Sequence, residues 1–307
     1  MSSLGKAVDE YLELRRAVGF KLEREARLLP DFVAYLDRRG ARTVTVELAL
    51  AWAKQPADGQ PAWWGTRLRI VRCFAKHLQA IDPRTEIPAS DLLPYRRRRA
   101  PYLYSDQEIA RLVEAAEGLC SPLNAATYAT LVGLLATTGM RVGEAVRLDR
   151  PDMDWIAGVL LIRDSKFGKS REVPLHETTV EALRTYARLR DRRLPRLKAA
   201  SFFISTTGTR LIPSNVDLTF LTLLDRAGIE SRSPHARPRP HDLRHTFATR
   251  TLLEWYRAGA DVQARLPLLS TYLGHVAPRT TYWYLTATPD LLEAVRQCVE
   301  RRREVQS

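Results

Sequence analysis

Residues 137–148 read TTGMRVGEAVRL and place an arginine directly after a glycine turn. The helical pattern of residues 123–138 stops at Gly139, and Arg141 stands at the start of the next predicted helix. Glu144 follows one turn later, so the two charged side chains share a face. An isolated arginine of this kind is more often a surface or ion-paired residue. Other parts of the chain must therefore decide whether Arg141 belongs to a site.

A second basic motif, Pro238-Arg-Pro240-His241-Asp-Leu-Arg244-His245, begins another predicted helix. The two prolines stiffen the approach to that helix. His241 and Arg244 are three residues apart and therefore lie on one face of the helix. A helix cap with a buried histidine would explain the same residues without any chemistry.

Three further candidates lie near predicted turns. Residues 154–175 change to a period of two and predict a β-meander, with Lys166 in the turn between two strands. The segment YLGH, residues 272–275, places His275 beside a glycine turn. Tyr284 follows nine residues later.

In this order and spacing, TTGMRVGEAVRL, the lysine turn, HDLRHTFAT, LGH and TT-x-x-Tyr resemble the motifs of tyrosine recombinases of the phage-integrase type. The resemblance covers residues 103–290, and the N-terminal region is similar to the core-binding domain of this family. It implies a site-specific DNA strand transferase with Tyr284 as its nucleophile. It also implies that five residues surround the scissile phosphate: Arg141, Lys166, His241, Arg244 and His275.

The chemistry of phosphodiester cleavage needs these residue types. Two guanidiniums, Arg141 and Arg244, can bind the non-bridging oxygens of a five-coordinate phosphorus through forked hydrogen bonds. A phenol is a poor nucleophile until a base such as His241 takes its proton. Lys166 can protonate the departing 5′ oxygen, and His275 can stabilise the transition state. A phosphotyrosine ester keeps the energy of the phosphodiester bond, so we expect no metal, ATP or other cofactor.

Two features depart from the family pattern. Between Arg244 and Leu273 the chain carries the segments EWY at 254–256 and LP at 266–267, so we expect a longer or kinked path to His275. Tyr282 also lies two residues from Tyr284, and only the spacing from His275 selects Tyr284.

The pattern predicts a mainly α protein with a small antiparallel β-meander. Four helices, near residues 4–18, 28–39, 45–53 and 61–81, form an all-α DNA-binding domain over 1–93. A basic, proline-rich linker over 94–102 joins it to an α+β catalytic domain over 103–307, in which helices resume from about 178. The capping box Ser105-x-x-Glu108 starts the first catalytic helix. A last helix over 288–303 carries an apolar stripe of Leu291, Leu292, Val295, Cys298 and Val299. By family resemblance we expect this helix to dock on a neighbouring subunit of a homotetramer on DNA, and packing on its own domain is the alternative.

The charge of the chain favours double-stranded DNA as its partner. The 307 residues carry a net charge of +13, and the excess occurs both before and after residue 100. The predicted DNA contacts are Arg96, Arg97, Arg98, Arg99, Lys169, Arg237 and Arg239. Three scattered cysteines, no apolar leader and no long apolar run indicate a cytoplasmic protein without disulfides or a membrane span.

Several alternatives remain open at this stage. His241 and His245 have the i, i+4 spacing of a metal pair, but the glutamate of His-Glu-x-x-His and an obvious third ligand are missing. The chain could also be a catalytically silent DNA-binding regulator, although such a protein has no reason to keep all six residue types. A nick-and-rejoin enzyme of the type IB topoisomerase kind would use the same chemistry. We expect an integrase or transposase of a mobile element.

Overall fold

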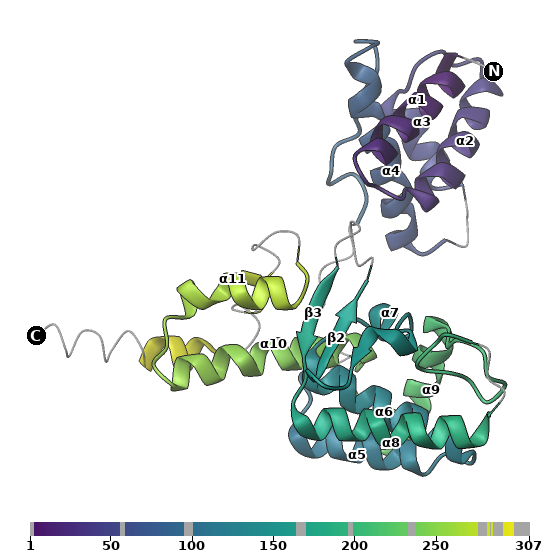
Figure 1. Cartoon of the computed structure of the whole chain (residues 1–307). Coiled ribbons are helices and arrows are strands. Elements are labelled where there is room, and N and C mark those ends of the chain that lie inside the picture. Colours follow the sequence, from purple (N-terminus) through teal and green to yellow (C-terminus); the bar gives the residue numbers. More distant parts are fainter. Residues whose placement is uncertain are drawn as a thin grey trace, which may run out of the picture. The chain divides into compact units, whose positions relative to one another are not determined.

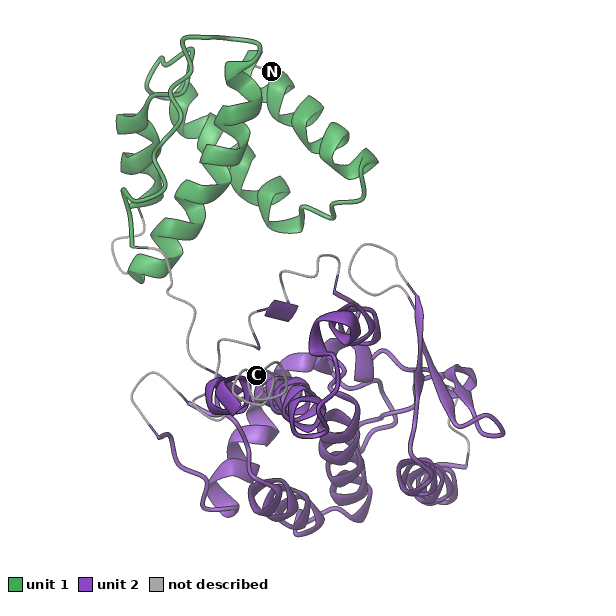
Figure 2. Cartoon of the chain, turned by 90° about the vertical axis from the view of Figure 1, so that its left-hand side faces the viewer, with its two compact units in different colours: residues 1–98 green, residues 99–307 purple. Residues whose placement is uncertain are grey.

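The computed structural model describes residues 3–55, 59–94, 101–163, 170–195, 199–232, 237–275, 281–282, 284 and 291–297. The chain divides into two compact units, Met1–Arg98 and Arg99–Ser307 (Figure 2). The division falls inside the segment 94–102 expected as a linker. Arg96, Arg97, Arg98 and Arg99 lie outside the described residues.

The first unit contains four helices in the described ranges, α1 (Ser3–Ala17), α2 (Glu23–Asp37), α3 (Val46–Ala53) and α4 (Pro61–Gln79). Their apolar stripes meet in one core that includes Phe32, Trp52 and Phe74, each fully buried. The Thr45 side chain caps α3, and Pro61 stands at the first turn of α4. The predicted all-α composition of this region is confirmed within the described residues.

The second unit consists mainly of helices, with a small sheet beside them (Figure 1). The described helices are α5 (Asp106–Glu117), α6 (Pro122–Thr138), α7 (Val142–Ala145), η1 (Arg150–Asp152), α8 (Glu177–Arg193), α9 (Pro213–Arg226), α10 (Pro240–Arg257) and α11 (Val262–Tyr272). The capping box of Ser105 and Glu108 begins α5 as predicted. Helix α6 contacts α5, α8 and α10 and therefore lies at the centre of the unit.

The sheet has three antiparallel strands in the order β1 (Met153–Asp154), β2 (Val159–Ile162) and β3 (Arg171–Pro174). In the outer hairpin Ile162 pairs with Arg171, and Leu160 pairs with Val173. The predicted β-meander is thus confirmed. The expectation of helices throughout from residue 178 is wrong for the segment before α9, where Ile204 forms a β-bridge with Arg210. Phe202 and Phe203 are buried there, so core packing holds this segment without a helix.

A smaller apolar cluster joins α10, α11 and the C-terminal part of the chain. It includes Leu252, Leu269, Tyr284 and Leu291, which is fully buried. Residues 291–297 are helical, but Leu292 is 62% exposed. Within the described residues the stripe therefore does not pack as a whole on its own domain, because Leu292 lies about 100° around the helix from Leu291 and faces solvent. Cys298 and Val299 lie outside the described residues.

None of the helices in the described part of the chain is long and apolar enough to cross a membrane.

Candidate active site

Arg141 is placed by the turn that ends α6. Gly139 closes that helix with a φ of +60°, a left-handed conformation that favours glycine, and Arg141 is the N-cap residue of α7. Its Nη1 lies 2.6 Å from Oε1 of Glu144, and its backbone N–H donates to Oε2 at 2.9 Å. Its Nη2 donates to the carbonyl oxygen of Gly274 at 3.2 Å. The predicted turn, helix start and shared face of Arg141 and Glu144 are all present.

Glu144 is held between two arginines, and the second one was missed by the sequence analysis. Arg171, on β3, binds both carboxylate oxygens of Glu144, at 3.1 and 2.9 Å. Burial alone would raise the pKa of Glu144, but Arg171 and Arg141 lower it to about 2. Arg171 shares the sheet face of the buried Val173. A charged residue on the buried face of a strand is usually paired, so the arginine at position 171 is the signal in the sequence that could have indicated a buried ion pair.

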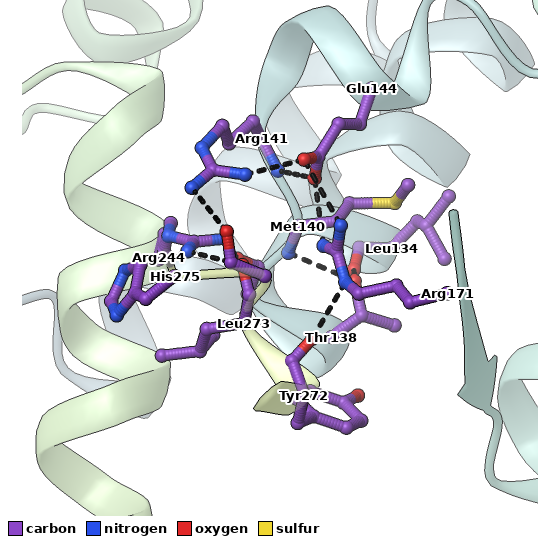
Figure 3. A network of polar contacts seen from close by, with 12 residues as sticks. Leu134, Thr138, Met140, Arg141, Glu144, Arg171, Arg244, Tyr272, Leu273 and His275 are labelled. Carbon is purple, nitrogen blue, oxygen red and sulfur yellow. Dashed lines mark hydrogen bonds and ion pairs between the residues drawn. The ribbon is translucent and has the colours of Figure 1, made fainter. Parts of the chain in front are cut away.

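Arg244 lies on α10 and is 2% exposed. Its Nη1 donates to the Gly139 carbonyl at 2.9 Å, and its Nη2 donates to the Leu273 carbonyl at 2.6 Å. Burial and the nearby positive charge of Arg141 lower its pKa to about 10, so it stays charged at neutral pH. Both predicted arginines thus reach the turn at residues 273–274, Arg141 from the start of α7 and Arg244 from α10 (Figure 3).

His275 follows this turn and contacts Arg244 through Nε2, at 2.9 Å from Nη2. A guanidinium can only donate, so Nε2 accepts and the proton of the neutral ring resides on Nδ1. Nδ1 lies 2.8 Å from Oγ1 of the fully buried Thr281. Burial and then Arg244 and Arg141 lower the pKa of His275 to about 3. Between Arg244 and His275 the chain completes α10, makes a short turn and continues through α11, which contains Pro267; whether this path is longer than in the family stays a prediction.

Tyr284 lies against this group of side chains. It is 3% exposed, whereas Tyr282 is 54% exposed. The Tyr284 ring stacks on His275, with centroids 5.9 Å apart, and meets the ring of His245 edge-on at 5.2 Å. Arg244 also lies close enough to Tyr284 for the two side chains to interact electrostatically. Of these two tyrosines, Tyr284 is the one that the structure places beside a buried cation and two imidazoles.

The histidines of α10 form a short row that ends at Tyr284. The His241 ring contacts the His245 ring at 5.1 Å, so His245 lies between His241 and the tyrosine. Burial and then neighbouring charged groups lower the pKa of His241 to about 4, although part of its surface is exposed. Burial and then His241 lower the pKa of His245 to about 3. Both rings are therefore neutral at pH 7 and can accept a proton.

In the described part of the chain, no group of three His, Cys, Asp or Glu side chains is placed to hold a metal ion. The structure therefore adds no support to the interpretation of His241 and His245 as a metal pair.

The other residues predicted in the second unit after residue 103 are Lys166, Lys169, Arg237 and Arg239. Lys166 and Lys169 lie between β2 and β3 in the chain, outside the described residues. Arg237 is exposed, and Arg239 pairs with the buried Asp242 at 3.0 Å. Their predicted DNA contacts stay predictions.

The charge of the assembled site suits an anion. Arg141, Arg171 and Arg244 carry three positive charges, and Glu144 carries one negative charge. With neutral imidazoles, these side chains have a net charge of +2 around Tyr284. A phosphate diester carries one negative charge and gains a second in the transition state of attack. The site can therefore bind a phosphate next to a buried phenol.

The family model for the phage integrase family matches residues 102–290, which is more than half of the chain. The integrase/recombinase y4rB of Sinorhizobium fredii is 46% identical over 311 residues and covers 99% of both proteins. The tyrosine recombinase XerD of Mycobacterium tuberculosis is 35% identical over 210 residues, which are 66% of this chain and 62% of XerD.

The structure of the Tn1549 transposon integrase in complex with transposon right end DNA has the same fold, with a TM-score of 0.69. It is 17% identical and covers 98% of this chain and 99% of that chain.

Proposed function

The chain belongs to the phage integrase family of site-specific tyrosine recombinases, and we propose that it cleaves and rejoins DNA through a covalent bond between Tyr284 and a 3′ phosphate. The observation that supports this mechanism best is the burial of Tyr284 against Arg244, His245 and His275. A phosphate bound beside this tyrosine would lie within reach of its hydroxyl oxygen, which attacks once a neighbouring base has taken its proton.

In the proposed reaction Arg141 and Arg244 bind the non-bridging oxygens of the scissile phosphate. Their hydrogen bonds to the carbonyls of Gly274 and Leu273 show that both guanidiniums face one turn, so one phosphate can meet donors from both. The Tyr284 oxygen attacks phosphorus, and the bond from phosphorus to the 5′ oxygen breaks. The reverse attack by a 5′ hydroxyl of a partner strand restores the phosphodiester and frees the tyrosine.

Proton transfer would use neutral imidazole and the lysine of the β2–β3 connection. The sequence assigns the base to His241, but the rings that touch Tyr284 are those of His245 and His275. His275 presents a free lone pair at Nε2 once its hydrogen bond from Arg244 is given up to the phosphate. We therefore propose His275 or His245 as the acceptor in this arrangement, with His241 behind them, and Lys166 as the acid for the 5′ oxygen.

The positive charge of the site makes a metal unnecessary for stabilising the transition state. Three arginines and one glutamate already supply a net charge of +2. We accordingly propose a reaction that needs neither a metal nor ATP.

The proposed partner is double-stranded DNA with specific recombination sites. The net charge of +13 supports this, as do solved relatives such as the Tn1549 integrase, which is bound to transposon end DNA. Together with the similarity to an integrase/recombinase along the whole chain, this favours a role in the movement of a mobile element. For assembly we propose a tetramer on DNA in which the exposed Leu292 and the residues after 297 contact a neighbouring subunit, while Leu291 stays in its own core.

A nicked suicide substrate tests the proposed function. The protein is incubated with such a duplex in EDTA and resolved on a denaturing gel, and we expect a covalent protein–DNA band. Absence of the band in EDTA and its appearance with Mg²⁺ would contradict the metal-free mechanism. Absence under all conditions would favour a silent DNA-binding regulator. A two-site recombination assay separates recombination from nick-and-rejoin relaxation, because only recombination exchanges strands between duplexes.

A further inference from the structure

Glu144 is shared by two arginines that come from different parts of the second unit (Figure 3). Arg141, before α7, contacts Oε1 through one nitrogen at 2.6 Å. Arg171, on β3, contacts both oxygens through a two-pronged fork at 3.1 and 2.9 Å. The Glu144 side chain is 1% exposed, so water does not screen these contacts.

One carboxylate can neutralise only one of the two guanidiniums. The side chain of Arg171 is 10% exposed and grips Glu144 with parallel hydrogen bonds, the strongest geometry for this kind of pair. The side chain of Arg141 is 27% exposed, and its Nη2 turns away toward the Gly274 carbonyl. The charge of Glu144 is therefore matched mainly by Arg171, and the charge of Arg141 is left over.

We propose that Arg171 is a positioning residue that neutralises Glu144, so that Arg141 keeps its positive charge for the scissile phosphate. This inference rests on the proposed function of the site. Without Arg171, the buried carboxylate would have Arg141 as its remaining ion-pair partner among the contacts seen here. Glu144 would then draw that guanidinium and its charge away from the DNA.

Arg171 has a second contact that links the sheet to the turn before His275. Its Nε donates to the Tyr272 carbonyl at 2.7 Å. A Cβ atom at Gly274 would lie 2.7 Å from Nη1 of Arg171, and Gly274 has a φ of +66°. The turn thus passes so close to the guanidinium that only glycine fits there. Arg171 therefore joins β3, Glu144 and the turn that also receives Arg141.

A lysine cannot replace these contacts. An ammonium is a point charge without the planar fork that binds two carboxylate oxygens and a carbonyl at once. Arg171→Lys should preserve the charge balance and lose the link to Tyr272, whereas Arg171→Met loses both. The two variants therefore separate charge from geometry.

The test is single-turnover cleavage of a suicide substrate by the full chain, together with the dissociation constant for the same DNA. We expect Arg171→Met to slow cleavage by at least about tenfold while the dissociation constant changes less than about threefold, because many other phosphates still hold the DNA. Arg171→Lys should give an intermediate rate. The matched control is Arg163→Met, which removes another arginine from the end of β2 that pairs with the buried Asp152, and it should cleave at the wild-type rate.

The decisive variant is the double substitution Arg171→Met/Glu144→Gln. If Arg171 serves to neutralise Glu144, removing the carboxylate should restore cleavage several-fold above that of Arg171→Met, and the double variant should match Glu144→Gln within about threefold. A residue that only supports the fold would make the double variant as slow as Arg171→Met or slower. Because the pair of buried charges is removed together, comparing the double variant with Glu144→Gln remains valid even if Arg171→Met does not fold.

Three results would overturn the inference: cleavage by Arg171→Met within about twofold of wild type, no recovery in the double variant, or a double variant more than about tenfold slower than Glu144→Gln. Failure of the wild-type protein to form any adduct would instead overturn the proposed function.

Discussion

Acidification from pH 7 to pH 5 should destabilise the second unit through His245 and His275. Burial, with His241 next for His245 and Arg244 next for His275, lowers the pKa of each ring from 6.5 to about 3. In the unfolded chain each ring takes up a proton as the pH falls through about 6.5, whereas in the folded chain it does so only near 3. Between these values the unfolded state binds more protons, so the stability falls as the pH falls.

The size of the effect follows from proton linkage. For one histidine with these two pKa values, a change from pH 7 to pH 5 removes about 2 kcal/mol of the free energy of unfolding, and the pair removes about 4 kcal/mol. Glu144 contributes little in this window, because its own stabilisation is lost only between about 4.5 and 2. A domain is typically stable by about 5 to 15 kcal/mol, so the loss is a large fraction of the total.

Urea unfolding of the full chain at both pH values measures this loss, and hydrogen exchange of the α10 amides reports on the second unit alone. His245→Gln and His275→Gln should each reduce the pH-dependent loss by about 2 kcal/mol. His176→Gln, at the exposed N-cap of α8, is the control and should leave it intact. A loss below about 1 kcal/mol in the wild type, or an unchanged pH dependence in both active-site variants, would refute the reasoning.

The other predictions concern single contacts. Gly139→Ala should lower the free energy of unfolding by about 2 to 4 kcal/mol in thermal melting, because the backbone is left-handed there and a Cβ would lie 2.5 Å from the Phe247 ring. Gly40→Ala, the control, has a left-handed φ but open space around it, so it should lose only the stability that backbone strain costs. Thr281→Val should slow adduct formation on the order of tenfold by removing the hydroxyl that holds His275 Nδ1, whereas Thr281→Ser should keep the rate; equal rates for the two would contradict the tautomer assignment. Lys166→Ala should slow cleavage, and a 5′-phosphorothiolate leaving group, which needs no proton, should rescue it; without rescue, Lys166 is not the acid.

The sequence predicts well those features that depend on local rules. The stop at Gly139, the helix start at Arg141 and the capping box of Ser105 each follow from residues within one turn of one another. The alternation of apolar and polar residues over 154–175 predicts strands, and the short connections between them favour antiparallel pairing of each strand with the next one along the chain. These local elements position most of the residues of the candidate site.

Features that depend on distant contacts were not predictable in the same way. The pairing of Arg171 with Glu144 joins residues of different elements. In the sequence, Arg171 differs from a solvated strand arginine only in that it falls on the same face of its strand as the apolar Val173. The contact of His245 with Tyr284 likewise depends on how the C-terminal part of the chain returns to α10. Leu291 and Leu292 also look alike in the sequence, and only packing decides that the first is buried and the second exposed.

The most direct test of the proposed mechanism is to identify the residue that bears the DNA. Protein trapped on a suicide substrate is digested with nuclease and protease, and the peptide that carries the nucleotide is sequenced by mass spectrometry. We predict a phosphotyrosyl bond at Tyr284, loss of the adduct in Tyr284→Phe with DNA binding retained, and an intact adduct in Tyr282→Phe. A nucleotide attached to Tyr282, or an adduct that survives in Tyr284→Phe, would contradict the account.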